Sequence, residues 1–62
     1  MELWLYTKDD PCPNMPLFVG TRSYCKHWIE RMVRDFPDEI WTETDNRNWE
    51  NVHGDKIRME MP

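Results

Sequence analysis

The chain has 62 residues and a formal net charge of −4, with 39% apolar and 13% aromatic residues. This length allows one domain with a single small core, and the aromatic content is too high for a disordered chain. The acidic balance argues against unaided binding to a nucleic-acid backbone, which needs clustered Lys and Arg.

Residues 2–7 predict the first strand. Leu3 and Leu5 alternate with Trp4 and Tyr6 in a segment rich in residues that favour a pleated sheet. The following segment, 8–20, carries prolines at 11, 13 and 16 and predicts a stiff, extended loop.

Residues 22–36 predict the one helix. Thr21 or Ser23 is the expected N-cap, and Pro37 ends the helix because the residue before a proline is pushed out of the helical region. The apolar residues recur at helical spacing as one wide stripe: Tyr24, Cys25, Trp28, Ile29, Met32, Val33 and Phe36.

Three segments complete the chain. Residues 39–44 alternate and predict a strand, with Ile40 and Trp41 on opposite faces. Residues 45–55 contain turn sequences around either a short strand or a long loop, and residues 56–61 alternate again and predict the last strand.

These elements predict a single α+β domain with the order β-α-β-β. One amphipathic helix would pack on one face of a small sheet of three or four strands, and the last strands would form a hairpin. The strand residues expected to face the helix are Leu3, Leu5, Ile40, Ile57 and Met59.

The two cysteines and two histidines raise the question of a zinc site. Cys25 and His27 are two residues apart on the helix, so at about 100° per residue their side chains point about 200° apart and cannot reach one ion. The paired ligand spacings of structural zinc sites are also missing. We therefore expect no metal and no cofactor, with Cys25 packed as a small apolar residue and His27 solvated beside Glu30.

A catalytic role is not expected either. Cys12 lies between two prolines, and its charged neighbours in sequence, two aspartates, oppose thiolate formation. The acidic residues do not match a calcium loop, and two glycines cannot supply a phosphate-binding loop. A chain this short has little room for a deep pocket, so we predict a non-enzymatic protein.

The predicted packing leaves three aromatic side chains, Trp4, Tyr6 and Trp41, on the sheet face opposite the helix. One interpretation is that the 8–19 loop covers this face with its apolar side chains, Met15, Leu17, Phe18 and Val19. The other is that the face binds a partner, because Trp and Tyr dominate interface hot spots.

Charge favours a basic partner. Five carboxylates and one arginine give residues 38–50 a charge of −4, whereas residues 22–37 carry +2. We predict an acidic protein-binding module, such as an inhibitor that occupies the basic surface of a nucleic-acid-handling protein, of the kind found on phages and other mobile elements. The predicted contact residues are Trp4, Tyr6, Glu39, Trp41, Glu43, Asp45, Trp49 and Glu50.

Two alternatives remain open. The chain could be a small homodimeric structural protein that buries the open sheet face against a second copy. It could also stack single-stranded nucleic acid on the aromatic residues, which the predicted acidic rim of that face, Glu2, Glu39 and Glu43, disfavours. The N-terminus lacks signal-peptide features and no apolar run reaches the roughly 20 residues of a membrane span, so we expect a cytoplasmic protein with reduced cysteines. A disulfide between the two cysteines is the alternative for an exported chain.

Overall fold

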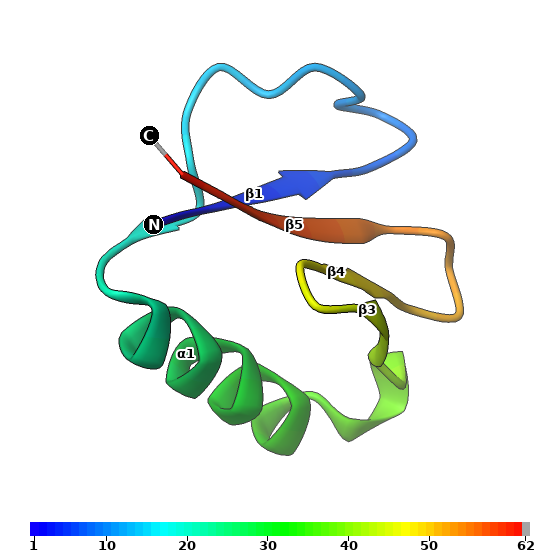
Figure 1. Ribbon diagram of the computed structural model, residues 1–62. Helices are drawn as coiled ribbons and strands as arrows, with labels where there is room; N and C mark the ends of the chain where they lie inside the picture. Colours follow the sequence, from blue (N-terminus) through cyan, green and yellow to red (C-terminus); the bar gives the residue numbers. More distant parts are fainter. Residues whose placement is uncertain (62) are drawn as a thin grey trace.

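A five-stranded antiparallel sheet carries one helix on one of its faces (Figure 1). The computed structural model describes residues 1–61. The strands lie in the order β2-β1-β5-β4-β3, and all neighbouring pairs are antiparallel. The elements are β1 (Glu2–Tyr6), β2 (Phe18–Val19), α1 (Arg22–Asp35), the 3₁₀-helix η1 (Pro37–Glu39), β3 (Thr42–Asp45), β4 (Asn48–Glu50) and β5 (Lys56–Glu60).

The α+β class agrees with the prediction, whereas the β-α-β-β order and the count of three or four strands are wrong. The additional strand β2 lies inside the predicted loop 8–20 and pairs with β1, with Phe18 opposite Leu3. A two-residue strand has no periodicity of its own, so only its pairing reveals it. The undecided segment 45–55 contains β4, which forms hairpins with both β3 and β5.

Helix α1 closely follows its predicted bounds because its end signals are local. The Thr21 hydroxyl oxygen accepts a hydrogen bond from the backbone N–H of Tyr24 at 3.2 Å, which satisfies one of the free N–H groups of the first turn. The backbone N–H of Phe36 donates to the Met32 carbonyl at 2.9 Å, and Pro37 then begins η1.

The predicted strand 39–44 begins later than expected. Glu39 belongs to η1 and Ile40 has a left-handed backbone with φ of 49°, so β3 starts only at Thr42. Ile40 is 59% exposed, and its predicted place in the core is therefore wrong. A left-handed β-branched residue is rare, and no alternation pattern anticipates it.

The core lies between α1 and the middle of the sheet. Leu3, Ile57 and Met59 face the helix as predicted, and Leu5 is half-buried. Trp49 pairs with Ile57 across β4 and β5 and is only 7% exposed. The Trp49 side chain therefore offers little surface for the partner contact that was predicted for it. The complete buried apolar set is Leu3, Cys25, Ile29, Trp49, Ile57 and Met59.

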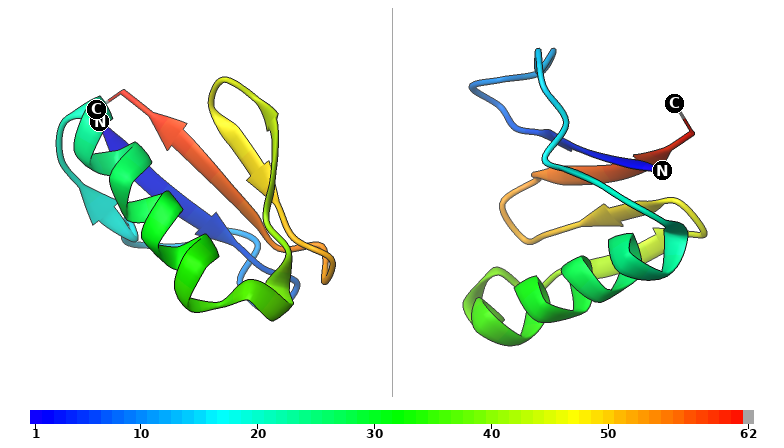
Figure 2. Two further views of the ribbon diagram at one scale, coloured as in Figure 1. Left: turned by 90° about the horizontal axis from the view of Figure 1, so that it is seen from below. Right: turned by 90° about the vertical axis from the view of Figure 1, so that its left-hand side faces the viewer.

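The proline-rich segment does not cover the opposite sheet face as one interpretation expected. Phe18 packs toward the core, with its ring stacked on that of Trp28, and Met15 and Val19 remain exposed. The segment before β2 arches away on the side opposite the helix (Figure 2).

Candidate functional site

A hollow lies between α1 and the sheet, on the sheet face that the sequence predicted to be covered by the helix. It has a volume of about 590 Å³. Apolar side chains form most of its wall: Leu5, Leu17, Phe18, Tyr24, Trp28, Met32, Phe36, Trp41 and Ile57. We call this hollow the helix-side groove.

The helix wall of the groove is a row of residues four apart. Tyr24, Trp28, Met32 and Phe36 follow one side of α1, and residues at this spacing lie one above the other on a helix. Tyr24 is 66% exposed and Phe36 is 57% exposed. The apolar arc of the helix, from Tyr24 to Val33, spans about 180° at 100° per residue. One sheet face cannot cover an arc that wide, so its edge stays open.

The opposite wall comes from β1, β2 and β5. The Phe18 ring lies 6.3 Å from the Trp28 ring, centroid to centroid, at an interplanar angle of 25°. This contact needs a small residue at position 20, because a Cβ on Gly20 would lie 2.9 Å from Cε2 of Phe18. Leu5 of β1 and Ile57 of β5 also line this wall.

Trp41 lies on the helix side of the sheet and packs against the core. Its Nε1 donates a hydrogen bond to Oε1 of Glu39 at 3.0 Å. The same indole lines a second, more polar hollow of about 440 Å³, together with Ile29, Val33 and Trp49. The prediction that Trp41 shares the open face with Trp4 is therefore wrong. The alternation correctly put Trp41 and Glu43 on one face, but that face points toward α1.

Charged side chains also line the groove, and more of them are acidic than basic. His27 and Arg31 lie along its helix side, and three carboxylates, those of Asp35, Glu39 and Asp55, also line it. Nδ1 of His27 lies 3.7 Å from Oε2 of Glu30, and both side chains are solvated, as predicted.

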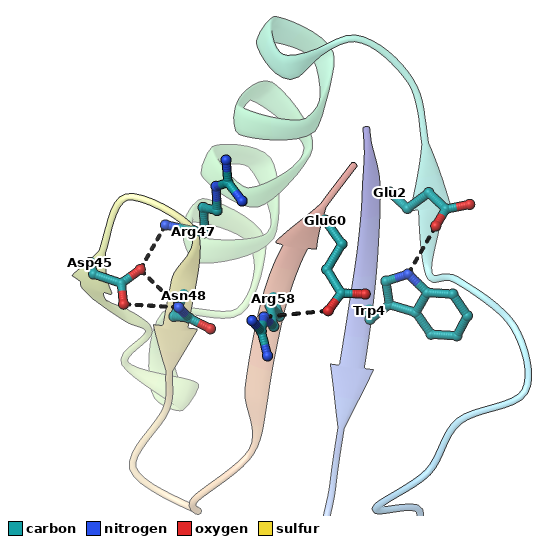
Figure 3. A network of polar contacts seen from close by, with 7 residues as sticks. All are labelled: Glu2, Trp4, Asp45, Arg47, Asn48, Arg58 and Glu60. Carbon is teal, nitrogen blue, oxygen red and sulfur yellow. Dashed lines mark hydrogen bonds and ion pairs between the residues drawn. The ribbon is translucent and has the colours of Figure 1, made fainter. Parts of the chain in front are cut away.

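The opposite sheet face carries a mixed set of charges (Figure 3). Trp4 pairs with Arg58 across β1 and β5, and Tyr6 pairs with Lys56. Trp4 and Tyr6 are half-buried, and Nε1 of Trp4 donates to Glu2 at 3.2 Å. The acidic rim predicted for this face is therefore wrong in part, because the basic side chains of β5 lie beside the aromatic ones.

Arg58 also pairs with Glu60, at 3.4 Å between Nε and Oε1 (Figure 3). Asp45, at the end of β3, accepts hydrogen bonds from the backbone N–H of Arg47 and from the Asn48 amide, both at 2.8 Å. The Arg47 N–H, followed by the Asn48 side chain, lowers the pKa of the Asp45 carboxyl below its ordinary value.

The eight predicted contact residues do not form one surface. Trp4, Tyr6 and Glu50 lie on the open sheet face, Trp49 lies in the core, and Asp45 belongs to the β3–β4 turn. The other three line the hollows on the helix side: Glu39, Trp41 and Glu43. Three exposed groove residues lie outside the predicted contact set: Tyr24, Phe36 and Leu17. The width of the apolar arc of the helix is the sequence signal that indicates the first two.

Cys25 is buried as expected, and Cys12 is an exposed free thiol. Within residues 1–61, no three His, Cys, Asp or Glu side chains are placed to hold a metal ion. The same residues contain no helix that is long and apolar enough to cross a membrane. Comparisons with protein-family models, curated proteins and solved structures find no match to this chain.

Proposed function

We propose that this protein is a non-enzymatic, acidic protein-binding module whose working surface is the helix-side groove. The observation that carries the proposal is the row of exposed and half-buried aromatic residues along one groove, including Tyr24, Trp28, Phe36 and Trp41. Aromatic side chains supply large contact areas at little entropic cost and are the commonest interface hot spots.

The form of the groove favours a protein segment over a small molecule. Small-molecule sites bury about 70–90% of their ligand, whereas Tyr24 and Phe36 are more than half exposed at the groove wall. These two residues are twelve positions apart, which corresponds to about 18 Å along the helix. A groove of that length suits a short helix or an extended strand of a partner.

Charge supports a partner with a basic surface. The chain has a net charge of −4, and the groove lining contains three carboxylates and one arginine. Opposite charge on the partner would speed encounter, and the aromatic residues would hold the complex. A nucleic-acid-handling protein offers such a surface, and occupation of that surface would inhibit it. We place this activity in the cytoplasm, where the exposed thiol of Cys12 would stay reduced.

Selection of peptide ligands tests the proposal. A displayed library of random twelve-residue peptides is selected on the wild-type protein, and the affinities of enriched peptides are measured by fluorescence anisotropy. The double variant Tyr24→Ala/Phe36→Ala should lose about tenfold or more in affinity, because truncation of a hot-spot residue typically costs more than 1 kcal/mol. Both side chains are largely exposed, so the variant should remain folded.

Two control variants decide where binding occurs. Met15→Ala/Val52→Ala removes exposed apolar side chains that do not line the groove and should leave the affinity unchanged. Trp4→Ala/Tyr6→Ala alters the open sheet face. A loss confined to that second variant, for peptides or for a single-stranded oligonucleotide, contradicts the groove proposal.

Light scattering adds an independent check. A tight dimer that dissociates in the Tyr24→Ala/Phe36→Ala variant would assign the groove to a second copy of this chain and overturn the proposal of a different partner.

A further inference from the structure

We infer that the groove binds a partner segment in which an arginine accompanies bulky apolar side chains, and that this arginine contacts the carboxylates of Glu39 and Asp55. This inference rests on the proposed function and specifies the chemistry of the partner. Its basis is the hydrogen bonding of the two carboxylates.

The Glu39 carboxylate is held in place by a hydrogen bond to one of its oxygens, and its other oxygen can accept more. Its Oε1 accepts from Trp41, and the backbone carbonyl of Glu39 accepts from the N–H of Val52 at 3.2 Å. The side chain is half-buried and lines the groove. Among residues 1–61, no group donates a hydrogen bond to Oε2 and no cation pairs with this carboxylate.

The Asp55 carboxylate is held in the same way by its own loop. Its Oδ2 accepts from Nδ2 of Asn51 at 3.1 Å, and its backbone N–H and carbonyl both bond to Asn51. Asp55 is also half-buried and lines the groove. Over the described part of the chain, no cation pairs with the Asp55 carboxylate either.

Glu39 and Asp55 line one groove, and the backbone of Glu39 accepts from Val52 in the loop that carries Asp55. Arginine suits two such carboxylates better than lysine does. Each carboxylate already uses one oxygen for a neutral donor, so a ligand must direct several donors to separate acceptors. A guanidinium offers five N–H donors in a planar fork, whereas an ammonium is a compact point charge. Phe36 and Trp41 line the same groove, and their rings suit stacking with a guanidinium plane.

The remaining charges give the bound segment a direction. Arg31 lies one turn before Asp35 on the groove side of α1, so an added cation is disfavoured beside it. The Phe18–Trp28 stack lies nearer the start of the helix and offers only apolar surface. The arginine of the partner therefore belongs at the end of the groove near the C-terminus of α1, with its apolar residues toward Phe18.

Synthetic peptides from the selection described above test this inference. An enriched peptide is prepared with arginine, with its neutral isostere citrulline and with lysine at the same position. Citrulline should weaken binding by about tenfold or more, because it cannot form the charge-assisted hydrogen bonds of a guanidinium. Lysine should bind with intermediate affinity.

A double-mutant cycle places the contact. Glu39→Gln/Asp55→Asn keeps the acceptor oxygens for Trp41 and Asn51, so the fold should persist. In this variant the arginine and citrulline peptides should bind with nearly equal affinity. The control Asp9→Asn/Glu50→Gln removes the same charge from residues that do not line the groove and should preserve the preference for arginine.

The outcomes separate the two proposals. This inference is overturned if the peptides that lose affinity in Tyr24→Ala/Phe36→Ala contain no basic residue. It is also overturned if citrulline weakens binding equally in the wild type and in the Glu39→Gln/Asp55→Asn variant. Either result leaves the protein-binding function standing. A selection that yields no groove-dependent peptide overturns both.

Discussion

Trp41 donates its indole N–H to the carboxylate of Glu39 across a residue with a left-handed backbone, Ile40. The same Glu-x-Trp spacing occurs at the N-terminus, where Trp4 donates to Glu2 within the regular strand β1. In β1 the two side chains share a face because they are two residues apart. At 39–41 the pair instead spans a strained position, and this pair lines the groove.

Strain at Ile40 predicts an unusual response to glycine. A left-handed conformation costs an L-residue about 1 to 2 kcal/mol, and glycine lacks that cost. Ile40→Gly should therefore be more stable than Ile40→Ala by about 1 kcal/mol, measured by urea unfolding. Val52, which is equally exposed and has no positive φ, provides the control. There the glycine variant should be the less stable of the two, and the same order at both positions would contradict strain at Ile40.

Asn51 should be the most sensitive polar residue in the chain. Its Oδ1 accepts from the backbone N–H groups of His53 and Asp55, both at 2.9 Å, and its side chain is buried. Asn51→Ala leaves these two donors without their acceptor and should cost about 2 kcal/mol or more, since each unsatisfied group costs at least about 1 kcal/mol. Asn46→Ala, at an exposed turn position, should stay within about 0.5 kcal/mol by thermal unfolding. Similar losses for both variants would show that the 51–55 loop does not depend on this side chain.

Asp45 should titrate below its ordinary pKa of 3.8. Because hydrogen bonds from Arg47 and Asn48 lower the pKa in the folded state, the carboxylate stabilises the fold above 3.8. That contribution is lost as the pH falls through the lower folded value. A ¹³C NMR titration of the Asp45 carboxyl should show this low midpoint, and Asn48→Ala should raise it. A midpoint that does not move in the variant would remove the Asn48 amide as a cause.

Two tryptophans should differ sharply in their effect on stability. Trp49→Ala opens a cavity in the core and should cost about 3 to 5 kcal/mol, a large share of the stability of a domain this small. Trp4→Ala removes a half-buried side chain on the open face and should cost clearly less. Circular dichroism during urea unfolding measures both without relying on indole fluorescence. Equal losses would contradict the different burial of the two side chains.

Local signals explain which parts of the fold could be predicted. Thr21 and Pro37 act on their own neighbouring backbone groups, so the ends of α1 are visible in the sequence. Leu3, Ile57 and Met59 alternate with polar or outward residues over five positions, which is long enough to identify strands β1 and β5.

Other features depend on contacts between distant segments. Strand β2 exists because Phe18 meets Leu3 across the sheet, and no pattern within two residues can indicate that pairing. Alternation in 41–43 shows that Trp41 and Glu43 share a face, but it cannot say which one. A shift of one residue in a strand exchanges its two faces. The prediction placed Ile40 on the helix side and Trp41 on the opposite face. Ile40 instead has a left-handed backbone and precedes β3, so the strand alternation does not extend to it.

Capping residues and periodicity within short segments made the α+β class, the helix and the strands β1 and β5 predictable from the sequence. The position of the aromatic groove on the helix side follows from how the helix packs on the sheet. One sheet face contacts only one side of a helix and leaves part of an apolar arc of about 180° uncovered, and this mismatch appears only when both surfaces are placed together.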